Sequence, residues 1–124
     1  MKTILFSLSA LFICGYANAQ LTNTKWKVTL NIPDPTEVIF DFRTDTVEAL
    51  AAESSESIET MLYTVKDTVL TLQKITGGSE CDDTVIGKYK FEMKDDGMYV
   101  TLIDDACDDR SNALNNNEKW TKVQ

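Results

Sequence analysis

Six aspartates in three adjacent pairs are the residues whose type and spacing could do chemistry. The pairs are Asp82-Asp83, Asp104-Asp105 and Asp108-Asp109, and they flank Cys81 and Cys107. Carboxylates held on loops are ligands that Ca²⁺ takes, but the spacing lacks the Asp-x-Asp-x-Asp-Gly pattern. Paired carboxylates also hydrolyse glycosides, yet here they fall in the predicted loops of a short chain. We interpret them as solvated loop charges and expect no metal site, with calcium binding as the open alternative.

The chain contains no histidine, which is the commonest general base and metal ligand. This removes His-based triads and most zinc sites. Ser-x-x-Lys, Gly-x-Ser-x-Gly and Gly-rich phosphate loops are also absent from the sequence. We therefore expect a protein that is not an enzyme, has no catalytic residues and uses no cofactor.

Residues 1–19 are typical of a secretory signal peptide. A positive charge precedes the apolar run Ile4–Ile13, and an Ala-Asn-Ala cleavage site follows it. The run is shorter than the roughly 20 residues that span a membrane. Cys14 could mark a lipidation site, but a bulky isoleucine precedes it. We expect a secreted or periplasmic protein whose mature chain, 20–124, is one small domain.

Acidic residues dominate the composition. The chain carries 12 basic and 20 acidic residues, a formal net charge of −8, and loss of Lys2 with the signal peptide would make it more negative. Nucleic acids and anionic membranes both require clustered positive charge. We therefore expect neither of them as a partner, and no later apolar stretch is long enough to span a membrane.

The cysteines Cys81 and Cys107 remain once the signal peptide is removed. In the oxidising compartment that the signal implies, a disulfide is the default state of such a pair. A redox or metal-binding pair is the alternative, although the spacing is far from Cys-x-x-Cys. The sequence therefore favours a structural disulfide that closes the loop between two predicted strands.

Residues 20–124 contain eight short stretches in which apolar and polar side chains alternate, the period-2 pattern of half-buried strands. We expect strands near 25–30, 38–43, 46–52, 58–65, 68–75, 84–94, 98–104 and 118–123. The stretch 46–52 also has helix propensity, and the polar segment 105–117 could form a helical turn and a loop. The short connections predict an all-β fold: a single antiparallel up-and-down β-barrel of about eight strands. A two-sheet sandwich would also fit.

Both ends of the mature chain resemble small secreted bacterial lipocalin-like (calycin-type) proteins. The start around Trp26 is similar to the Gly-x-Trp motif of the first lipocalin strand, with Thr24 in place of the glycine. The later matching segments are Cys81, Gly87-Lys88-Tyr89-Lys90-Phe91, Gly97, Val100-Thr101-Leu102, Asp105-Ala106-Cys107-Asp108-Asp109-Arg110, Leu114 and Trp120. The resemblance implies that Arg110 packs over Trp26 and closes the barrel. Arg110 could instead bond to loop carbonyls or bind an anionic ligand headgroup.

A ligand-binding barrel would line its pocket with inward-facing side chains, mostly apolar and with a few polar anchors. The candidates are Phe40, Phe42, Met61, Tyr63, Leu70, Leu72, Tyr89, Phe91, Val100 and Leu102. The same residues could instead form a filled core. We expect the lipocalin-like protein to bind a small apolar ligand in the barrel. The alternative is a non-enzymatic protein-interaction or inhibitor module with a filled core.

Overall fold

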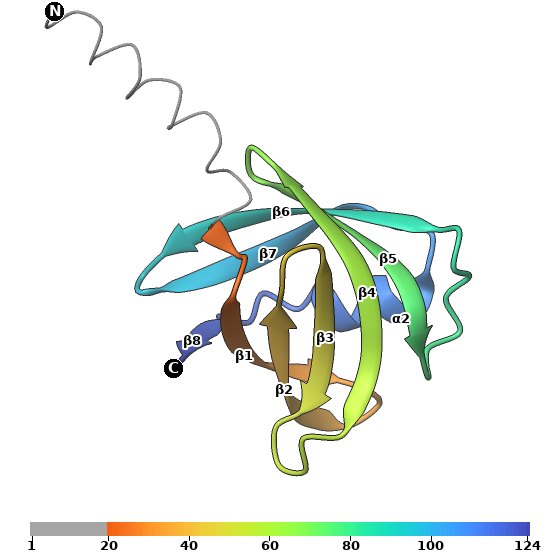
Figure 1. Cartoon of the computed structure of the whole chain (residues 1–124), viewed down its shortest axis with the longest axis horizontal. Helices are drawn as coiled ribbons and strands as arrows, with labels where there is room; N and C mark the ends of the chain where they lie inside the picture. The colour runs from red at the N-terminus through yellow and green to blue at the C-terminus, as the bar shows by residue number, and fades with distance from the viewer. Residues whose placement is uncertain (1–19) are drawn as a thin grey trace, which may run out of the picture.

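The computed structural model describes residues 20–124, so the predicted signal peptide lies outside the described residues. Residues 20–124 form an all-β fold, with eight strands and one short helix, α2 (Asp108–Leu114) (Figure 1). The strands are β1 (Thr24–Asn31), β2 (Pro35–Phe42), β3 (Thr46–Ala51), β4 (Ser57–Lys66), β5 (Val69–Gly77), β6 (Ile86–Lys94), β7 (Gly97–Asp104) and β8 (Thr121–Val123).

All strands belong to one antiparallel sheet in the order β7-β6-β5-β4-β3-β2-β1-β8. Each strand from β1 to β6 pairs with the next along the chain, which is an up-and-down arrangement, and β8 pairs with β1. An isolated bridge between Met98 of β7 and Trp120, just before β8, nearly closes the sheet on itself. The prediction of an eight-stranded antiparallel barrel is therefore confirmed. Because the strands form a single sheet, the two-sheet sandwich is excluded.

Local sequence explains some of the strand boundaries, and pairing between strands explains others. The turn between β6 and β7 has positive φ at Asp95 and Asp96, the conformation of a type I′ hairpin turn. The segment with competing helix propensity forms β3, because it pairs with both β2 and β4. The last strand is shorter than expected, since Trp120 makes only the isolated bridge. The polar segment after β7 forms α2, a longer helix than the single turn expected.

Inward side chains from the strands form the core. In β1, for example, Trp26, Val28 and Leu30 are buried, and the residues between them are not. Phe40 stacks on Trp120 with ring centroids 4.5 Å apart. Aromatic pairs in proteins commonly adopt such stacked geometry. No helix within residues 20–124 is long and apolar enough to cross a membrane.

Candidate ligand-binding site

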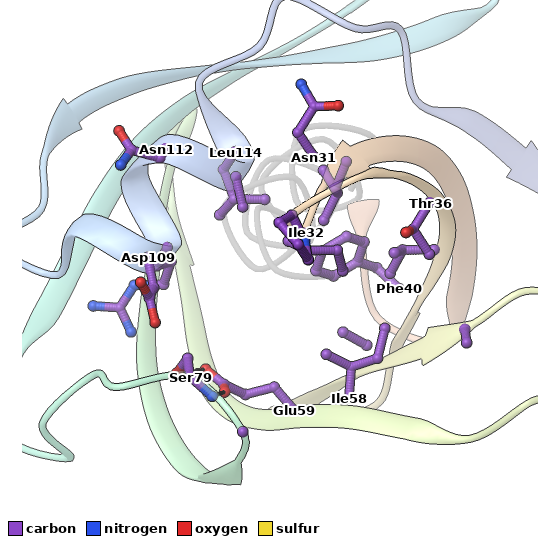
Figure 2. A pocket seen from close by; sticks show the side chains of 18 of the residues that line it. Asn31, Ile32, Thr36, Phe40, Ile58, Glu59, Ser79, Asp109, Asn112 and Leu114 are labelled. Carbon is purple, nitrogen blue, oxygen red and sulfur yellow. Dashed lines mark hydrogen bonds between the residues drawn. The ribbon is translucent and has the colours of Figure 1, made fainter.

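A cavity of about 750 Å³ opens at one end of the barrel (Figure 2). Its wall comes from the adjoining ends of β1 to β4, the loop between β5 and β6, and α2. Most of the lining is apolar: Leu30, Ile32, Pro33, Val38, Phe40, Ala49, Ala51, Ile58, Met61, Ala113 and Leu114. Small side chains on β3, Ala49 and Ala51, leave part of this space open. The cavity is therefore an open, mainly apolar pocket within the end of the barrel.

The structure places two of the ten predicted pocket residues, Phe40 and Met61, in the wall of this cavity. Seven others are buried in the hydrophobic core: Phe42, Tyr63, Leu70, Leu72, Tyr89, Phe91 and Val100. The tenth, Leu102, is partly buried and packs against that core. The inward direction of these side chains follows from the strand period. Their position along the barrel axis decides whether they meet a cavity or other side chains.

A polar edge borders the cavity on the side of the β5–β6 loop. Figure 2 shows Glu59 and Ser79 next to each other, with Asp109 nearby on α2. The Glu59 carboxylate accepts hydrogen bonds from Ser79, from the backbone N–H at 3.2 Å and from Oγ at 2.9 Å. Neither Glu59 nor Ser79 was among the predicted pocket residues. The sequence did contain a signal for Glu59. This residue lies two residues before Met61 and four before Tyr63, so on a strand its side chain points inward with theirs.

Arg110 lies at the same end of the barrel and forms a buried ion pair with Asp105. The Arg110 Nε donates to Asp105 Oδ2 at 2.6 Å, and Nη2 donates to Oδ1 at 2.9 Å. The two side chains are only 3% and 0% exposed. Nη2 also donates to the Val85 carbonyl at 3.1 Å. These bonds fix α2 against the loop that precedes β6.

Two further donors complete the surroundings of Asp105. The Tyr89 hydroxyl donates to Oδ2 at 2.5 Å, and the Cys107 N–H donates to Oδ1 at 2.9 Å. Burial acts to raise the pKa of the Asp105 carboxyl, but the bonds from Arg110, Tyr89 and Cys107 hold that pKa below its usual value. Burial, followed by the bond to Asp105, raises the pKa of the Tyr89 phenol well above its usual range. Asp105 is therefore ionised and Tyr89 protonated at neutral pH.

Cys81 and Cys107 form the predicted disulfide, with their Cα atoms 5.3 Å apart. It joins the β5–β6 loop to the residue immediately before α2. A second link lies beside it, where Glu80 N–H donates to Asp109 Oδ2 at 2.8 Å. The disulfide therefore holds together two of the segments that line the cavity.

Arg110 and Trp26, the predicted closure pair, are each 5% exposed. Trp26 Nε1 donates at 2.9 Å to Thr24 Oγ1, so the residue that replaces the motif glycine anchors the indole. The one cation–π contact recorded for residues 20–124 joins Lys94 to Tyr99 and involves neither Arg110 nor Trp26. The structure thus gives Arg110, a residue of α2, a polar role in the ion pair with Asp105, and packing of Arg110 over Trp26 stays a prediction.

The acidic pairs of the sequence do not act as one group. Asp105 is buried beside Arg110, Asp109 accepts from Glu80, and exposed Asp82 accepts from the backbone and hydroxyl of Thr84. No group of three or more His, Cys, Asp or Glu residues suited to a metal ion occurs in the described part of the chain. Three of the six carboxylates therefore have structural roles, and the interpretation as solvated loop charges is wrong for Asp105, whose side chain is buried.

The fold and cavity together define a class of protein: a small antiparallel β-barrel with a disulfide and one open, largely apolar end. Comparison of the chain with protein-family models, curated proteins and solved structures gives no match. The resemblance to lipocalin-like proteins therefore stays a prediction.

Proposed function

We propose that this protein is a secreted or periplasmic, non-enzymatic, lipocalin-like protein that binds a small apolar molecule in the open end of its barrel. The observation that supports this proposal is the cavity of about 750 Å³ and its mainly apolar wall. Ligand pockets in proteins usually have volumes of about 300–1,000 Å³ with a few polar groups. The polar edge at Glu59 and Ser79 supplies such groups.

Binding of the neutral fluorophore N-phenyl-1-naphthylamine tests this proposal, because its emission rises in an apolar site. We expect saturable binding by the mature protein and its loss in Ala51→Trp, which would place an indole in the cavity wall. Leu50→Trp is the matched control, since the adjacent side chain of β3 points to the other face. Equal binding by both variants, or none by the unaltered protein, would contradict the proposal. If the probe binds as expected, native mass spectrometry of freshly purified protein would identify any retained ligand.

A protein-interaction module remains the second candidate because of two exposed apolar side chains on the outer face of the barrel. Leu62 of β4 and Ile86 of β6 flank Gln73 of β5 in register, and are 42% and 50% exposed. Apolar side chains that share an outer face can form a contact surface. This candidate requires that Leu62→Glu abolish capture of a partner while probe binding by the cavity is unchanged.

A further inference from the structure

Glu59 places a buried carboxylate in the wall of the cavity. Glu59 is 7% exposed, faces inward from β4 and lines the cavity. Its two hydrogen bonds both come from Ser79. A carboxylate offers about four lone-pair sites, so it retains the capacity to accept further donors.

The backbone beyond β5 is shaped around this carboxylate. Gly77 has φ of +145°, a conformation that side chains disfavour, and a Cβ there would lie 2.5 Å from Glu59 Oε1. The close approach of the backbone at position 77 to Glu59 therefore requires glycine. This path of the chain places the N–H and hydroxyl of Ser79 within hydrogen-bond distance of the two carboxylate oxygens. The acid is held in a fixed place rather than exposed on a mobile side chain.

Glu59 has no cationic partner within the described residues. None of the ion pairs of residues 20–124 includes it. The ammonium of Lys74, on the neighbouring strand, donates instead to the Ser79 carbonyl at 2.6 Å. Arg110 is the cationic side chain of the lining, and its charge is paired with Asp105.

The cavity lining therefore has an unbalanced negative charge. Asp109 is a second carboxylate in the lining, and it accepts a hydrogen bond from a neutral backbone N–H. Arg110 Nη1 lacks a hydrogen-bond partner, but less than 1 Å² of it is exposed, so a headgroup in the cavity does not reach it. Burying a charge without a partner is unfavourable, and a cation beside Glu59 would relieve this. A carboxylate headgroup would be repelled.

We infer that the cavity selects amphiphiles with a cationic amine head, which Glu59 binds while the apolar wall takes the body of the molecule. The inference rests on the proposed function and specifies the ligand class. An alkylammonium head would donate to the free acceptor sites of Glu59 in a charge-assisted hydrogen bond, stronger than a neutral one. Its hydrocarbon chain would lie against side chains such as Leu30, Phe40 and Met61.

Isothermal titration calorimetry at pH 7 with octylamine, 1-octanol and octanoate tests this selection with chains of equal length. We expect octylamine to bind the mature protein about tenfold to a hundredfold more tightly than 1-octanol, and octanoate to bind most weakly. In Glu59→Gln, which keeps the shape and can bond to Ser79 if the Ser79 hydroxyl turns to accept from the amide NH₂, octylamine should lose this advantage while 1-octanol is unaffected. Glu53→Gln is the matched control, because Glu53 is exposed and lies outside the cavity lining.

The three compounds separate failure of the inference from failure of the proposed function. If 1-octanol or octanoate binds the unaltered protein as tightly as octylamine, the cavity binds ligands but the selection by Glu59 is refuted. The same holds if Glu59→Gln keeps the preference for the amine. If none of the compounds and no neutral fluorophore binds, the proposed function itself fails. The comparison on the unaltered protein stays decisive even if Glu59→Gln does not fold.

Discussion

Replacing Asp105 by asparagine is expected to destabilise the barrel by about 3–5 kcal/mol, the cost of leaving a buried charge without its partner. The geometry explains why an isosteric amide does not substitute. Each carboxylate oxygen accepts two donors: Oδ1 from Cys107 N–H and Arg110 Nη2, and Oδ2 from Tyr89 and Arg110 Nε. Whichever way the amide is turned, its NH₂ group faces at least one N–H donor that cannot accept: Arg110 Nε in one orientation, and Cys107 N–H with Arg110 Nη2 in the other. Each buried donor left unsatisfied costs about 1–3 kcal/mol, which agrees with the same range.

Urea denaturation followed by circular dichroism measures this difference, and Asp104→Asn is the matched control. Asp104 is the adjacent aspartate and is exposed, so its substitution should change the free energy of unfolding by less than about 0.5 kcal/mol. The double variant Asp105→Asn/Arg110→Met should be more stable than Asp105→Asn alone, because the unpaired guanidinium is then also absent. A loss below about 1 kcal/mol in Asp105→Asn would refute the assigned role of the ion pair.

The pH dependence supplies an independent check on the same residue. The pKa of Asp105 is lower in the folded protein than its ordinary value of about 3.9. The ionised carboxylate therefore contributes its full stabilisation above about pH 4, and this contribution is lost as the pH falls through the folded pKa. The stability difference between the unaltered protein and Asp105→Asn should be constant from pH 5 to 8 and shrink below about pH 4. A difference that persists unchanged in acid would contradict the sign of the shift.

Two further predictions concern the same end of the barrel. In Gly87→Ala the new Cβ would lie 2.3 Å from Asp105 Oδ2, so we expect a loss of at least about 2 kcal/mol in urea denaturation. Gly78→Ala, whose Cβ meets nothing within 4 Å, should cost much less, and equal losses would count against this reasoning. Removing the disulfide in Cys81→Ala/Cys107→Ala opens a loop with a sequence separation of 26 residues and should cost about 3–4 kcal/mol. Reductant should destabilise the unaltered protein by a similar amount and leave the double variant unchanged, whereas an equal response of both would argue against a stabilising disulfide.

Much of the fold could be predicted because its signals are local. The alternation of apolar and polar residues marks the strands, and the residues Asp95-Asp96-Gly97 mark a hairpin turn that the structure confirms. The disulfide followed from the number of cysteines and the expected compartment. The segment Thr46–Ala51 shows the limit of such reasoning, since its strand state depends on pairing with strands on both sides rather than on its own propensity.

The position of the cavity could not be predicted in the same way. Alternation tells which side chains face inward, but it does not tell how far along the barrel axis the inward side chains fill the space. That depends on the register of neighbouring strands and on where α2 and the β5–β6 loop lie. The missed residue Glu59 did leave a local signal, namely a charged side chain in the inward phase of β4. Inward charges in an otherwise apolar strand face merit the same attention as catalytic motifs.

The two ends of the barrel differ in how their interior is stabilised, and this bears on binding. At the filled end, aromatic side chains such as Phe42 and Tyr63 contact each other edge to face. At the open end, directional links add to the apolar contacts: the disulfide, and the ion pair of Asp105 with Arg110. Such links hold the wall of an empty cavity in place, and a wall that is already ordered loses less conformational entropy when a ligand enters. The same links that stabilise the fold at this end therefore also favour binding by keeping the Glu59 carboxylate and the apolar wall in a fixed arrangement.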